Sequence, residues 1–185
     1  MQRRLILAAG AATGCSGLLP PASANSVAVP AEIAREMPDG VLAGSARMRY
    51  FGFSVCDARL WVHPRFQLAT YWQHPLALEL TYQRDLKGSA IAQRSLDEMR
   101  RNGPIAPETA SLWLSTMNSI FPNVGLGDRI AGVHMVGTGA RFWFNGQLRS
   151  TVPDPEFSRL FFGIWLSDRT SEPRLRAELL SGLQP

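Results

Sequence analysis

The chain has 185 residues, of which 45% are hydrophobic, 18% charged and 9% aromatic. This length suits one ordinary domain with a processed leader and is too short for two large enzymatic domains. The composition excludes wholesale disorder, a collagen-like repeat and a coiled coil. The formal charge is +4, and every basic residue except Lys87 is arginine. We interpret this as a general preference for arginine and expect no nucleic-acid partner.

Residues 1–24 have the pattern of a secretory signal peptide. Arg3 and Arg4 supply a positive start, an uncharged apolar stretch runs from Leu5 to Leu19, and Ala22–Ala24 offers small residues for cleavage after Ala24. Glycines interrupt the apolar stretch and two prolines follow it, so it is too short for a stable membrane-spanning helix. We therefore expect a periplasmic or secreted protein with no integral membrane segment after cleavage.

Three alternatives stay open for this leader. It could remain as an uncleaved anchor, or Arg3 and Arg4 could direct the chain to the twin-arginine pathway. Cys15 could carry a lipid, although no leucine precedes the short motif around it, which makes lipoprotein anchoring the weaker match.

Cleavage after Ala24 would leave Cys56 as the single cysteine of the mature chain. An unpaired thiol in an oxidising compartment is best kept buried, so we expect Cys56 in the core. The alternative is a catalytic thiol paired with His63, His74 or His134, but no spacing singles out one of them. The same scatter argues against a metal site. We expect no metal and no cofactor.

Alternating and helical hydrophobic patterns divide the chain into elements. Residues 25–39 read as a lead-in segment with at most one helical turn at Glu32–Met37, after which structure begins. Period-two and turn patterns predict strands within 41–62 (a pair bent near Gly52), 76–83, 129–136, 140–145 and 147–152. Amphipathic and capping patterns predict a helix after Gly88 that is closed by Asn102-Gly103-Pro104, and helices over 107–120, 157–166 and 175–183.

The usual catalytic motifs are absent from the sequence. There is no G-x-S-x-G, H-E-x-x-H, phosphate-binding glycine loop or C-x-x-C. Gly137-Thr138-Gly139 lies between two predicted strands and is read as a turn. The carboxylates at Asp97-Glu98 and at Asp154 and Glu156 fit charged helix faces and helix starts better than catalysis.

Two arginines of the first predicted strand are candidate ligand-binding residues. Arg47 and Arg49 share one face, whereas Ala46, Met48 and Tyr50 share the other. An arginine that points into an apolar space needs an anionic partner, and a ligand carboxylate would supply it. The alternative is that both arginines lie on a solvated face and pair across strands with Asp57 or Glu79.

The order of these elements and several local strings resemble a known family. The run from Leu42 to Val62 (LAGSARMRYFGFSVCDARLWV) is similar to the opening strand pair of chalcone isomerase-like proteins, in particular their bacterial secreted branch. The strings at 78–85, 95–98, 121–128 and 161–180 follow in the family's order. The resemblance covers roughly residues 40–183 and places the domain at 40–185.

The resemblance implies an α+β fold, an antiparallel β-sheet with helices packed on one face, also described as an open-faced β-sandwich. In this family the cleft between the layers holds a flavonoid in plant enzymes and a fatty acid in related plastid proteins. The enzymes use a first-strand arginine and a tyrosine beyond the third strand. Here Ile91 aligns with that tyrosine, and Ile91 can neither donate a proton nor orient a water.

We therefore expect an exported, non-catalytic domain that binds a small apolar or amphipathic ligand such as a fatty acid, with Arg47, Arg49 and Tyr82 as candidate ligand-binding residues. The first alternative is an intramolecular lyase or isomerase that acts on a chalcone-like unsaturated ketone, with Arg47 or Arg49 as the electrophile and Tyr82 in place of the missing tyrosine. The second is a cell-envelope protein-interaction module, which an exposed patch of Trp61, Tyr71 and Trp72 would indicate. The oligomeric state is left open.

Overall fold

A computed structural model describes residues 27–183 of the chain. The predicted signal peptide, with Cys15, lies outside the described residues. The strands are β1 (Val41–Tyr50), β2 (Phe53–Val62), β3 (Leu76–Tyr82), β4 (Arg129–Met135), β5 (Gly139–Phe144) and β6 (Gln147–Val152). The helices are α1 (Ala31–Glu36), η1, a 3₁₀-helix (Leu68–Gln73), α2 (Gly88–Asn102), α3 (Pro107–Ile120), α4 (Pro155–Leu166) and α5 (Pro173–Leu179).

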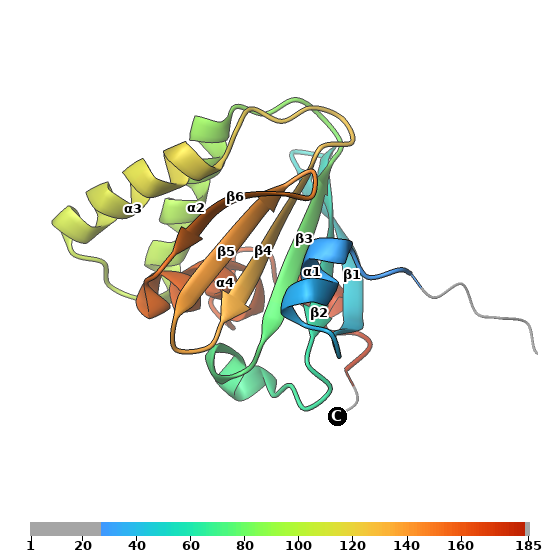
Figure 1. Cartoon of the computed structure of the whole chain (residues 1–185). Coiled ribbons are helices and arrows are strands. Elements are labelled where there is room, and N and C mark those ends of the chain that lie inside the picture. The colour runs from blue at the N-terminus through green and yellow to red at the C-terminus, as the bar shows by residue number, and fades with distance from the viewer. Residues whose placement is uncertain (1–26, 184–185) are drawn as a thin grey trace, which may run out of the picture.

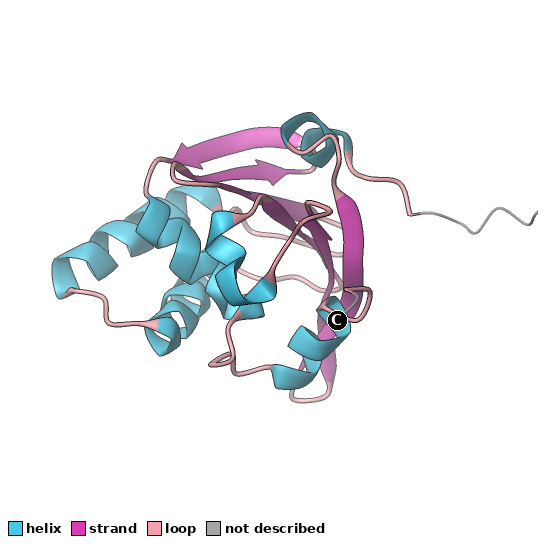
Figure 2. Ribbon diagram, turned by 90° about the horizontal axis from the view of Figure 1, so that it is seen from below, coloured by secondary structure: helices cyan, strands magenta, loops and turns pink. Residues whose placement is uncertain are grey.

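The strands form one antiparallel sheet in the order β1-β2-β3-β4-β5-β6, so every strand pairs with its neighbour in sequence (Figure 1). The sheet curves around α2, α4 and α5, with α3 beside α2, and α1 lies on the opposite, convex face (Figure 2). This arrangement confirms the predicted antiparallel sheet with helices packed on it. Within residues 27–183, no helix is long and apolar enough to span a membrane.

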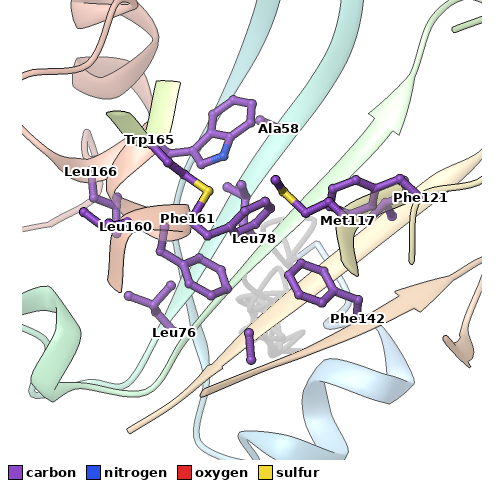
Figure 3. Close-up of a cluster of buried hydrophobic side chains, with 14 of the residues drawn as sticks. Ala58, Leu76, Leu78, Met117, Phe121, Phe142, Leu160, Phe161, Trp165 and Leu166 are labelled. Carbon is purple, nitrogen blue, oxygen red and sulfur yellow. The ribbon is translucent and has the colours of Figure 1, made fainter. Parts of the chain in front are cut away.

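The main core fills the space between the concave face of the sheet and the helices. Side chains of α3, α4 and the strands gather there into one cluster, among them Met117, Phe142 and Phe161 (Figure 3). The rings of Phe157 and Phe161 on α4 stack at 5.7 Å between centroids, and Phe142 meets Phe161 edge-on at 5.1 Å. Burying a side chain of this size contributes about 1.5–3 kcal/mol. Among the described helices α4 buries the most residues, including Phe157, Phe161 and Trp165.

The start of α4 follows the predicted capping pattern. The Asp154 carboxylate accepts hydrogen bonds from the backbone N–H groups of Glu156 and Phe157 at 3.0 Å, and Pro155 occupies the first turn. The same carboxylate accepts a bond from Trp113 Nε1 of α3 at 2.9 Å. One side chain therefore caps α4 and ties it to α3.

The lead-in segment belongs to the fold, although the sequence placed the start of structure after it. Ile33 and Met37 are buried against Trp61 and Trp143 on the convex face of the sheet. The central strands carry apolar side chains on both faces, so the convex face of the sheet must also be buried by another element. Helix α1 provides that cover, and its Glu36 accepts hydrogen bonds from Arg141 of β5 at 2.8 Å.

A buried carboxylate lies beneath α1. Glu79 of β3 is 3% exposed and accepts a hydrogen bond from Trp61 Nε1 at 3.2 Å. Arg59 lies 3.5 Å from it across the strand pair, and Arg129 lies 3.9 Å away and also pairs with Glu32 of α1. These partners account for a charge that would otherwise be costly to bury.

Candidate functional site

A cavity of about 320 Å³ lies between the β1–β3 end of the sheet and helices α2, α4 and α5. Most of its wall is apolar, and this part comprises Met48, Tyr50, Val55, Leu80, Leu86, Ala90, Ile91, Phe121, Ile130, Phe161, Ile164, Trp165 and Leu175. Small-molecule pockets typically have volumes of roughly 300–1,000 Å³ and are lined mainly by such side chains. The cavity therefore has the size and character of a site for one small apolar chain or ring system.

Cys56 and Tyr82, which face each other across β2 and β3, contribute polar groups to the wall. Burial raises the pKa of the Cys56 thiol to about 12 and raises the pKa of the Tyr82 phenol well above its ordinary value. Both groups are therefore neutral near pH 7. The thiol is a poor nucleophile in that state, and the phenol remains a hydrogen-bonding group. Cys56 is 1% exposed, which confirms the prediction that it is buried.

The remaining polar residues of the cavity wall come from α2 and the segment that leads into α5: Arg94, Ser95, Glu98, Thr170, Ser171 and Glu172. Arg94 is the arginine among them, and because its side chain is 47% exposed it lies where the cavity opens to solvent. Its Nη2 lies 2.8 Å from Glu98 Oε1 and donates to Ser171 Oγ at 3.4 Å. Within residues 27–183, Nε and Nη1 of Arg94 donate no hydrogen bond, so both donors are unsatisfied.

The predicted ligand-binding arginines lie outside this cavity. Met48 and Tyr50 of β1 line it, and strand alternation turns Arg47 and Arg49 to the opposite face. Arg47 donates to both carboxylate oxygens of Asp57 on β2, at 2.6 and 2.9 Å, which is the cross-strand pairing considered as the alternative. Arg49 is exposed. The structure brings only Tyr82, of the three candidate residues, to the cavity.

The sequence did not single out Arg94 as a cavity residue, because only its position on one face of a predicted helix indicates it. Ile91, Ser95 and Glu98 recur at the spacing of one helix face, with Arg94 at its edge, and all four line the cavity. In sequence the same stripe is typical of an ordinary amphipathic helix with a solvated charged side. The i to i+4 pair of Arg94 and Glu98 was present in the sequence, but such pairs are common on exposed helices.

Other residues considered in sequence have structural roles. His134 is buried; its Nε2 lies 2.8 Å from the Trp72 carbonyl oxygen and its Nδ1 lies 2.7 Å from Ser158 Oγ. Trp61 is buried beneath α1, and the buried Tyr71 donates to the Arg159 carbonyl at 2.8 Å, so these residues form no exposed patch with Trp72. In the part of the chain that is described, no group of three or more His, Cys, Asp or Glu side chains could hold a metal ion.

Comparison with known families agrees with the sheet and the helices. The family described as chalcone isomerase-like matches residues 41–181. The chain belongs to this family. Among solved structures, this chalcone isomerase-like chain is similar to a fatty-acid binding protein of Arabidopsis thaliana, with a TM-score of 0.61 and 10% sequence identity over 77% of this chain and 87% of that one. No curated protein matches the chain.

Proposed function

We propose that this chalcone isomerase-like protein binds a small amphipathic carboxylate, such as a fatty acid, without catalysing a reaction on it. The observation that carries the proposal is the apolar cavity of about 320 Å³ with Arg94 at its mouth. The apolar wall would take the tail, and the free Nε and Nη1 donors of Arg94 would take the carboxylate. The similar Arabidopsis thaliana structure is of a fatty-acid binding protein, which supports this ligand class.

The chemistry of the cavity supports binding over catalysis. Ile91, the residue that aligns with the tyrosine of the plant enzymes, contributes only hydrocarbon to the wall. The Cys56 thiol, with its pKa raised to about 12, is protonated at neutral pH. Neither residue offers a group that would transfer a proton or attack a carbonyl under these conditions.

Calorimetric titration with dodecanoic acid and with dodecanol tests the proposal. The acid should bind the native protein about tenfold more tightly than the alcohol, because a charge-assisted hydrogen bond at a half-exposed arginine stabilises only the acid. Arg94→Met should remove that preference. Arg47→Met is the matched control, since Arg47 is also paired with a carboxylate but lies on the opposite face. An unchanged preference in Arg94→Met would refute the assigned carboxylate site.

The isomerase alternative keeps one supporting observation, the neutral Tyr82 phenol in the cavity wall. It predicts that the purified protein cyclises a chalcone, followed by the loss of chalcone absorbance, and that Tyr82→Phe abolishes the reaction. Turnover in the native protein that disappears in Tyr82→Phe would replace the binding proposal with catalysis.

We also propose that the protein is exported by way of residues 1–24 and belongs to a bacterial secreted branch of the family. The charged start, the apolar stretch and the small residues before Asn25 support this. N-terminal sequencing of protein recovered from the cell envelope should begin at Asn25. A product that begins at Met1 and remains in the cytoplasm would contradict export.

A further inference from the structure

The turn between β1 and β2 exposes aromatic side chains beside the cavity. Phe51 is 84% exposed, Phe53 65% and Tyr50 50%. Tyr50 also lines the cavity, so the turn continues directly from the cavity wall. Large exposed apolar side chains grouped at one point usually mark an interaction site.

Phe51 adopts a backbone conformation that is unfavourable for phenylalanine, so it does not stabilise the turn. Phe51 and Gly52 form a two-residue hairpin with φ of 47° and 79°, the geometry in which asparagine or glycine is preferred at the first position. The β5–β6 hairpin has nearly the same angles, 49° and 80°, and uses Asn145-Gly146. The same chain therefore carries the favoured residue at one turn and an exposed phenylalanine in a left-handed conformation at the other, at a cost to folding.

Cations surround the aromatic turn. The guanidinium of Arg84 lies 5.4 Å from the centre of the Phe53 ring, and that of Arg94 lies 5.8 Å from the centre of the Tyr50 ring. Arg49 is exposed next to Tyr50, and neither Arg49 nor Arg84 forms an ion pair within residues 27–183. The acidic residue of this strand pair, Asp57, forms an ion pair with Arg47.

We propose that this turn, Tyr50 to Phe53, docks the protein on the surface of a bilayer that contains anionic lipids. Aromatic rings prefer the headgroup level of a membrane, and exposed arginines beside them gain from negative headgroups. The cavity mouth adjoins the turn through Tyr50, so a docked molecule would bring its mouth to the lipid surface. The proposal relies on the proposed function only for this last point, and docking can be measured without any fatty acid.

Vesicle flotation tests the docking. The full chain is mixed with vesicles of phosphatidylcholine alone or of phosphatidylcholine with phosphatidylglycerol, and the bound fraction is compared between variants, so that any contribution of residues 1–26 is common to all. Phe51→Asn with Phe53→Ser should reduce partitioning to the anionic vesicles roughly tenfold or more, as expected when the burial of aromatic side chains is lost. Arg49→Gln with Arg84→Gln should reduce it in the anionic vesicles and leave the neutral ones unchanged.

Two controls separate docking from general effects. Leu126→Ser removes an equally exposed apolar side chain, 75% exposed, from another loop and should leave partitioning unchanged. Phe51→Asn alone should hold or raise the thermal unfolding midpoint, because asparagine suits the turn. Native partitioning by the turn variants would overturn the proposal, whether or not the protein binds dodecanoic acid. An equal loss of vesicle binding in Leu126→Ser would also overturn it. The same holds if the turn binds a protein partner or a second copy of the chain but no vesicles.

Discussion

Nη2 of Arg94 lies 2.8 Å from Oε1 of Glu98 one turn further along α2, and both side chains line the cavity. Glu98 is 6% exposed, and Arg101 lies 3.5 Å from its other carboxylate oxygen. Within the described residues that second oxygen, Oε2, is buried and accepts no hydrogen bond. The cavity therefore holds an arginine that is partly neutralised by its own helix, and a ligand carboxylate would compete with Glu98 for it.

Glu98→Gln should tighten the binding of dodecanoic acid by about tenfold or less, because it removes a negative charge next to the proposed carboxylate position. Binding of dodecanol should not change. In the double variant Arg94→Met, Glu98→Gln the gain for the acid should disappear, because no arginine then holds the carboxylate beside residue 98. Calorimetric titration measures the binding of the acid and the alcohol by each variant. Weaker binding of the acid by Glu98→Gln would show that Glu98 positions Arg94 and does not oppose the ligand.

Gly44 of β1 packs against the backbone at the end of α5. A Cβ at this position would lie 2.5 Å from the carbonyl oxygens of Glu178 and Leu179. Gly44→Ala should therefore push α5 from the sheet and destabilise the protein by about 1–3 kcal/mol in urea unfolding. Ligand affinity should fall as well, because Leu175 of α5 lines the cavity.

Gly103→Ala is the matched control for this prediction. Its added Cβ would lie 3.4 Å from the nearest side-chain atom, an ordinary contact with Leu160. It should leave affinity unchanged. An unaltered unfolding midpoint in Gly44→Ala would contradict the tight packing of α5 on β1.

The thiol of Cys56 should be unreactive in the native state. It is 1% exposed and its pKa is raised to about 12, so both access and the thiolate fraction are low at pH 8. Alkylation followed by peptide mass spectrometry should find Cys56 unmodified in buffer and fully modified in concentrated urea. Rapid alkylation in buffer would contradict the burial of the cavity wall.

The protein should lose stability on acidification because of His134. The Trp72 carbonyl can only accept, so Nε2 of His134 carries the proton and Nδ1 accepts from Ser158 in the neutral ring. Burial lowers the pKa of His134, so the unfolded chain binds a proton more readily than the folded one. This stabilisation is complete above the unfolded pKa of about 6.5 and is lost as the pH falls towards the lowered folded value.

His134→Gln removes this titration. Urea unfolding between pH 5 and 8 should show a variant that is less stable than the native protein near pH 7.5, by a margin that narrows as the pH falls. A constant difference between the two proteins over this range would show that His134 does not titrate on unfolding.

Much of the fold could be predicted from local patterns in the sequence. The capping pattern at Asp154-Pro155, the Asn145-Gly146 hairpin and the alternation at Leu76–Tyr82 each specify local geometry, and the structure follows them. The packing of α1 could not be read in this way, because its six residues give too short a pattern and its partners Trp61 and Trp143 lie far along the chain. Such packing depends on contacts between residues far apart in the chain, which the local spacing of hydrophobic residues does not show.

Of the three residues predicted for the candidate site, only Tyr82 lines the cavity. Strand alternation correctly separated Arg47 and Arg49 from Met48 and Tyr50, but period two alone does not say which face meets the cavity. That choice depends on where α2 and α5 pack. The arginine at the mouth, Arg94, came from a helix whose charged edge looks solvated in sequence.

Native mass spectrometry of the purified protein, followed by organic extraction, tests most directly whether the cavity holds an amphipathic carboxylate. The native chain should carry one acyl or other apolar acid per molecule. Ile91→Trp, which fills the cavity from α2, should be free of it, and Leu112→Trp, at a side chain 64% exposed on α3, should carry it like the native chain. A native chain that stays free of ligand when dodecanoic acid is added in excess, or equal loading of Ile91→Trp, would contradict the assigned cavity.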